Sequence, residues 1–164
     1  MATVTVETHI GGAFPAAVYD LVADLPRMGE WSPECERVEW TGATAAPVSG
    51  AQFTGHNRLG GRHWSTHGTV TVAERGREFT FEIRSVLNLP VALWRYRFEA
   101  RDGGCRVIES TEDRRGGLIR LVGRLATGVG DRPARNRETM TVTLERLRAA
   151  VEKAGATGGS PRHL

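Results

Sequence analysis

The chain begins with an alternation of hydrophobic and polar residues and then changes to a helical period. In residues 3–10 the apolar side chains share one face, which is typical of a strand with one buried side. Apolar residues then recur at helical spacing over 14–25, with Pro15 in the first turn. We therefore expect a strand, a helix and a second short helix that reaches Trp31.

From residue 37 to residue 113 the period is two. Glycine pairs at 60–61 and 103–104 separate some of the alternating segments and are typical of hairpin turns. Uninterrupted alternation of this kind favours an antiparallel meander over alternating strands and helices. The expected strands are 37–40, 52–58, 62–73, 78–86, 91–101 and 105–113.

The helical period returns after residue 117. A first apolar stripe spans 118–125, and the helical pattern is then interrupted by glycines and Pro133. A longer stripe follows, and we expect Gly155 to cap its helix. This second stripe consists of Met140, Leu144, Leu147 and Val151. Residues 156–164 are small and polar, which predicts a disordered tail.

These elements predict a single α+β domain over residues 1–155. One large sheet and one long helix must cover each other's apolar faces, because no other long element is available. The expected architecture is a curved antiparallel sheet of about seven strands around the long C-terminal helix, with two short helices after the first strand. A twisted sheet contacts one helix well only at its centre, so we expect a cavity between them.

The inward positions of the predicted strands are rich in aromatic residues. A concave apolar surface with a few polar groups is suited to small-molecule binding. Plain core packing is the alternative for Trp64 and Trp94. The residues expected to line the cavity are Trp31, Trp40, Phe53, Asn57, Trp64, Thr66, Phe79, Phe81, Trp94, Phe98, Met140 and Leu144.

Three further residues are candidates for catalysis. Tyr96 and Arg62 could polarise a carbonyl group, and Glu109 is the inward carboxylate of the central strands. Burial would raise the pKa of Glu109 toward the range useful for proton transfer. The alternative is structural, with Glu109 satisfied by Asn57, a neighbouring arginine or a buried water.

Composition limits the other function classes. The 164-residue chain has a net charge of only +3, and acidic residues are interleaved with its arginines, which argues against nucleic-acid binding. It has no apolar run of the roughly 20 residues that span a bilayer and no signal-peptide pattern, so we expect a cytoplasmic protein without membrane insertion. No metal-ligand spacing or cofactor motif is present, and Cys35 and Cys105 are expected to be reduced.

Several blocks in order, among them "ADLPRMGEWSPECERVEWTG", "LWRYRFEA" and "NRETMTVTLERLRAAVEKAG", resemble the SRPBCC superfamily over residues 2–155. The resemblance is to its actinobacterial polyketide cyclase/dehydrase and lipid-transport-like branch. It implies the helix-grip (START-like) fold and a cavity for a hydrophobic ligand. The aromatase/cyclases of this superfamily resemble one another in an arginine deep in the pocket, whereas the inward positions after Trp64 here are Thr66 and Gly68.

Two functions remain open. The chain could be a polyketide cyclase/dehydratase of bacterial secondary metabolism, which closes and dehydrates a poly-β-ketone. It could instead be a non-catalytic carrier or sequestering protein for a lipid, a quinone or another apolar metabolite. A polar pair inside the cavity, such as Tyr96 with Glu109, favours the enzyme, and a uniformly apolar cavity favours the carrier. The sequence does not identify the ligand or decide between a monomer and a homodimer.

Overall fold

The computed structural model describes residues 3–157. Its strands are β1 (Thr3–Gly11), β2 (Cys35–Thr41), β3 (Gln52–Leu59), β4 (Arg62–Glu74), β5 (Glu78–Ser85), β6 (Pro90–Arg101) and β7 (Gly104–Asp113). The helices are α1 (Pro15–Ala23), the 3-10 turn η1 (Leu25–Arg27), α2 (Met28–Trp31), α3 (Gly117–Thr127) and α4 (Arg132–Thr157).

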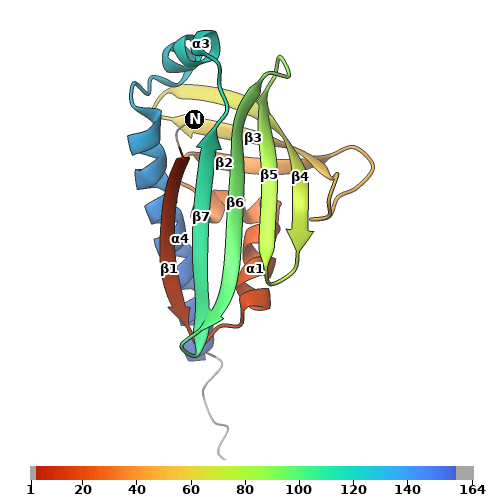
Figure 1. Cartoon of the computed structure of the whole chain (residues 1–164), viewed down its shortest axis with the longest axis vertical. Helices are drawn as coiled ribbons and strands as arrows, with labels where there is room; N and C mark the ends of the chain where they lie inside the picture. Colours follow the sequence, from red (N-terminus) through yellow and green to blue (C-terminus); the bar gives the residue numbers. More distant parts are fainter. Residues whose placement is uncertain (1–2, 158–164) are drawn as a thin grey trace, which may run out of the picture.

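The seven strands form one antiparallel sheet in the order β1-β7-β6-β5-β4-β3-β2. Figure 1 shows the sheet curving around α4, which confirms the predicted α+β helix-grip architecture. The long helix packs mainly on β1, while α1 packs on β5, β6 and β7. No helix in the described part of the chain is long and apolar enough to cross a membrane.

Local sequence explains where several elements begin and end. Pro15 occupies the first turn of α1, where its missing N–H is not needed. Gly60 and Gly103 have positive φ angles in the β3–β4 and β6–β7 turns, a conformation that favours glycine.

The C-terminal helix runs further than its sequence indicates. The predicted cap at Gly155 is wrong, because α4 continues through it to Thr157. A glycine near a helix end is tolerated at a cost of about 1 kcal/mol. The rest of the predicted tail, residues 158–164, lies outside the described residues.

Aromatic rings fill the interior beneath α1. Tyr19 of α1 makes edge contacts with Phe79 and Phe98, at ring-centroid distances of 5.9 and 5.5 Å. Phe81 continues the cluster toward Tyr96. This end of the sheet is therefore closed by packed side chains, and Tyr96 on β6 borders the cluster as the register partner of Phe79.

Candidate functional site

Tyr96 and Glu109 form a buried hydrogen-bonded pair in the interior. The two residues are direct partners in the register of β6 and β7, so both side chains point to the same face. The Tyr96 hydroxyl donates to Glu109 Oε1 over 2.7 Å, and the two residues are only 3% and 1% exposed. Two of the three predicted catalytic residues are thus in contact.

Burial sets the protonation of this pair. Desolvation raises the pKa of Glu109 to about 8, and the hydrogen bond from Tyr96 lowers it by a smaller amount. Burial, with Glu109 nearby, raises the pKa of Tyr96 well above its usual value. At neutral pH Glu109 is therefore mainly a neutral acid, and Tyr96 remains a phenol.

The proton of Glu109 belongs on its second oxygen. Because Oε1 accepts from Tyr96, the acid form places its O–H at Oε2, which is buried and has no hydrogen-bond partner among the described residues. The hydroxyl of Thr111, two residues along β7 on the same face, is also buried, and no residue of 3–157 bonds it. Unpaired buried polar groups are costly, so these atoms suit a ligand's polar group.

Arg62, the third predicted catalytic residue, lies away from this pair. It is exposed at the start of β4, and its guanidinium donates to the backbone carbonyl of Leu125 near the end of α3. Gly128, just beyond that helix, lies close to the same side chain. Arg62 therefore links β4 to the α3 segment.

The predicted lining residues fall into two groups. Phe53, Phe79, Phe81 and Phe98 are buried in the packed aromatic cluster. The other strand residues are only half-buried: Trp40, Asn57, Trp64, Thr66 and Trp94. Asn57 pairs with Trp64 and Gly55 pairs with Thr66 in the register of β3 and β4. The paired side chains therefore lie on the same face of the sheet.

Helical residues enclose the same interior. Met140 and Leu144 of α4 are buried, as the sequence predicts for the second apolar stripe. Trp31 at the end of α2 is also buried, and its indole Nε1 has no partner among the described residues. Thr139 and Thr143 are buried beside the stripe, but each hydroxyl bonds a backbone carbonyl of its own helix.

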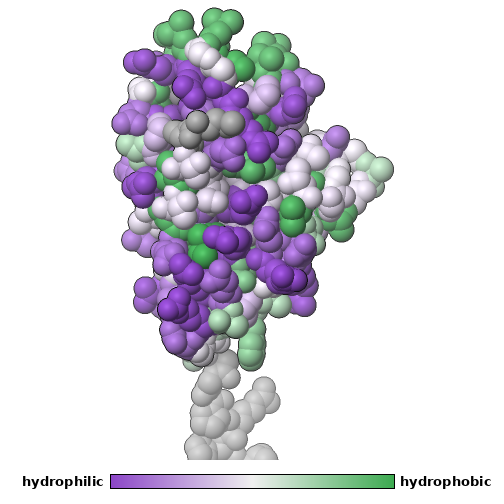
Figure 2. Space-filling view, viewed as in Figure 1, coloured by the Kyte–Doolittle hydropathy of each residue, from purple (hydrophilic) through white to green (hydrophobic). Residues whose placement is uncertain are grey.

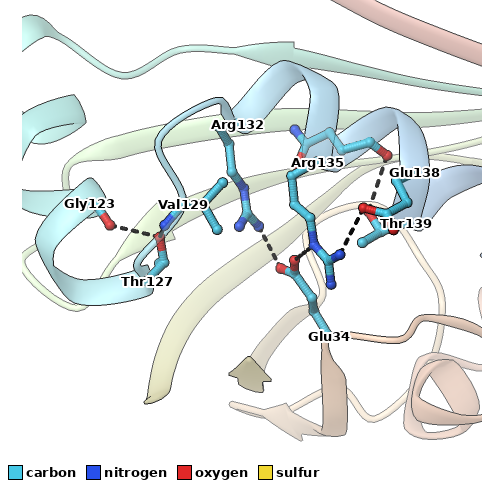
Figure 3. A network of polar contacts seen from close by, with 9 residues as sticks. Glu34, Gly123, Thr127, Val129, Arg132, Arg135, Glu138 and Thr139 are labelled. Carbon is cyan, nitrogen blue, oxygen red and sulfur yellow. Dashed lines mark hydrogen bonds and ion pairs between the residues drawn. The ribbon is translucent and has the colours of Figure 1, made fainter. Parts of the chain in front are cut away.

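The sequence did not point to an ion-pair cluster at the start of α4, shown in Figure 3. Glu34, between α2 and β2, accepts from Arg132 Nη2 over 2.8 Å and from Arg135 Nε over 2.9 Å. The Arg132 guanidinium also lies 5.9 Å from the centroid of the Trp64 ring. Arg132 lies about two helical turns before Met140 on the same stripe, and this spacing is the sequence signal that could have identified Arg132.

The cluster leaves one buried donor free. Glu34 is almost fully buried, and it holds one side of the Arg132 guanidinium. Nη1 of Arg132 is buried with no partner among the described residues. The predicted lining residue Trp64 therefore faces a cation whose orientation Glu34 fixes.

Two hollows in the described part of the chain lie on the surface. One lies between the start of α1 and the β6–β7 turn, and the other lies among the end of β5, the start of β6 and the end of β7. Neither is situated between the sheet and α4. The cavity around the Tyr96–Glu109 pair consequently stays a prediction.

The fold and the interior define a helix-grip protein, and comparison with known families is more specific. Residues 1–152 match the family described as polyketide cyclase / dehydrase and lipid transport. The chain belongs to this family. The comparison with curated proteins found no match.

Solved structures share the fold. A polyketide-cyclase-like protein from Corynebacterium glutamicum is 28% identical, with a TM-score of 0.58 over 98% of this chain and 95% of its own. A major latex-like protein from Panax ginseng is 10% identical, with a TM-score of 0.67 over 91% and 96% of the two chains. The di-domain ARO/CYC StfQ of the steffimycin pathway is 15% identical, with a TM-score of 0.69 over 94% of this chain and 51% of its own.

Proposed function

We propose that this protein binds a small, largely apolar carbonyl compound between the sheet and α4 and catalyses its dehydration or cyclisation. The supporting observation is Glu109, a buried neutral acid whose Oε1 accepts from Tyr96 and whose Oε2 has no partner among the described residues. A carboxylic acid that is already protonated can donate its proton, or a hydrogen bond, to a ligand oxygen. The aromatic walls would bind the carbon skeleton.

The proposed chemistry needs only one carboxyl group. In the dehydration of a β-hydroxy ketone, Glu109 Oε2 gives its proton to the leaving hydroxyl as the C–O bond breaks and water departs. In the same step the α-proton of the ketone passes to the Glu109 carboxyl group, and the electrons of that C–H bond form the double bond. Glu109 returns to its acid form, so the net change is the loss of one water molecule. Tyr96 keeps the carboxyl oriented throughout.

The test is turnover of a synthetic aromatic β-hydroxy ketone, followed by the absorbance of the conjugated product. Glu109→Gln keeps the shape of the side chain and removes proton transfer, so it should abolish turnover and retain binding. Glu112→Gln is the matched control. Glu112 also lies on β7, but its carboxylate forms an ion pair with Arg114 and does not contact Tyr96. Turnover that is unchanged in Glu109→Gln would contradict the catalytic role.

A carrier function is the second proposal. It is favoured by the apolar core cluster to which Tyr96 belongs, and in a carrier Glu109 would only donate a hydrogen bond to the ligand. Binding of an apolar fluorescent probe by the wild type, with no turnover of any β-hydroxy ketone tested, would support it. The cytoplasmic location and the choice between monomer and homodimer stay predictions.

A further inference from the structure

One end of the molecule exposes most of its large hydrophobic side chains. They belong to α3 and to the turn between β5 and β6, which Figure 1 places at the same end. Figure 2 shows both as hydrophobic patches on that end of the surface. We call this surface the apolar end, and it consists of Val86, Leu87, Leu89, Leu118, Leu121, Val122 and Leu125, each between 42% and 77% exposed.

The orientation of α3 is the reverse of what a surface helix normally adopts. Leu118, Leu121 and Leu125 share one helical face, and that face points to solvent. Ile119 and Gly123 are half-buried on the other side, where a Cβ on Gly123 would lie 3.3 Å from Arg115. The helix thus packs on the side that carries Ile119 and Gly123, and its leucine stripe is free for another contact.

The charge around the apolar end is positive. Residues 114–130 contain four arginines and no acidic residue, and residues 84–90 contain Arg84 and no acidic residue. Within residues 3–157, Arg84 and Arg124 form no ion pair, while Arg120 shares Asp113 with Arg115. Exposed leucines flanked by arginines are typical of helices that lie in a membrane interface.

We propose that the apolar end docks on the surface of a bilayer that contains anionic lipids. The α3 leucines and Leu87 would enter the boundary between headgroups and acyl chains, and Arg120 and Arg124 would contact lipid phosphates. A second copy of the chain is a poorer occupant, because a symmetric contact would bring these arginines against each other. Docking in the plane of the interface needs no spanning segment, and it is independent of the proposed catalysis.

Vesicle flotation tests this proposal with the full-length protein. We expect binding to vesicles of phosphatidylcholine mixed with phosphatidylglycerol, weaker binding to phosphatidylcholine alone, and a decrease as salt rises. The double variant Leu118→Ser/Leu125→Ser should lower binding by about tenfold or more, because it removes buried apolar area. Arg120→Gln/Arg124→Gln should lower binding to the anionic vesicles by about fivefold for each arginine.

Matched controls separate docking from general stickiness. Phe14→Ser removes an 82% exposed aromatic side chain that lies outside the apolar end, and Arg77→Gln removes an exposed arginine at the β4–β5 turn. Both should bind vesicles like the wild type, and all variants should keep the wild-type melting temperature. The proposal is overturned if the wild type binds neither vesicle, or if the Leu118→Ser/Leu125→Ser variant binds normally. It is also overturned if light scattering shows that the wild type is a dimer and that the Leu118→Ser/Leu125→Ser variant is a monomer.

Discussion

The ring of Phe53 lies directly across the sheet from Gly68, its register partner on β4. A Cβ on Gly68 would lie 2.0 Å from Phe53 Cζ, and contacts with Trp40 and Phe81 restrict the ring. Gly68→Ala should therefore overpack the interior and cost about 1–3 kcal/mol of unfolding free energy. Urea denaturation measures this.

Gly61→Ala is the control for that substitution, because nothing lies within 4 Å of a Cβ there. Its unfolding free energy should stay near the wild-type value. Equal stability of the Gly68 and Gly61 variants would show that Phe53 can move aside.

Glu109 should make stability depend on pH. Its pKa is raised from 4.5 to about 8, so between these values the unfolded chain loses the proton while the folded protein keeps it. The folded state then binds more protons, so the contribution of Glu109 to stability falls as pH rises through this window and is constant outside it. The fall is on the order of a few kcal/mol, and Glu109→Gln should lack it.

Two measurements examine this behaviour. Urea unfolding of the wild type and Glu109→Gln across the window gives the difference in slope. NMR titration of the carboxyl carbon gives the midpoint directly, and a midpoint at or below 4.5 would rule out Glu109 as the neutral acid.

Trp64→Ala should affect ligand binding more than stability. Trp64 is half-buried beside Arg132, whereas Phe79 is fully enclosed by the cluster under α1. Phe79→Ala should cost about 3–5 kcal/mol, and Trp64→Ala should cost less while weakening an apolar fluorescent probe more strongly. Probe titration and thermal unfolding of both variants decide this. Unchanged affinity with a collapsed melting temperature would identify Trp64 as core.

Glu34→Gln should loosen the start of α4. The substitution leaves Arg132 and Arg135 without their buried carboxylate, and losing charged hydrogen bonds costs about 1–3 kcal/mol. Glu138→Gln breaks only an exposed pair with Arg135 and should cost less than about 1 kcal/mol. Denaturant unfolding of both variants tests the difference, and similar costs would argue against a structural role for Glu34.

The alternation of the sequence predicted the strands and the inward direction of Tyr96 and Glu109, because side chains along a strand alternate between its faces. The contact between these two residues additionally depends on the register of β6 and β7. Register follows from turns and packing along the whole hairpin, and the alternation within each strand does not determine it.

Other features had no periodic signal. Glu34 and Arg132 are 98 positions apart, and an ion pair between such distant segments depends on how α2 and α4 meet. The stripe on α3 predicted an amphipathic helix, but it did not reveal that the apolar face is exposed. Arg62 shares the phase of Trp64, yet it bends away toward α3 because a long side chain at a strand end is free to reach a neighbouring segment.

The position of β1 affects how the polypeptide reaches its native state. Among the described strands β1 pairs only with β7, and it packs under α4, so both of its partners follow it at a large distance in the sequence. In a nascent chain β1 therefore stays unpaired until β7 has left the ribosome, and contacts of such large sequence separation slow folding. During that interval the backbone of β1 is an open template for pairing with other chains.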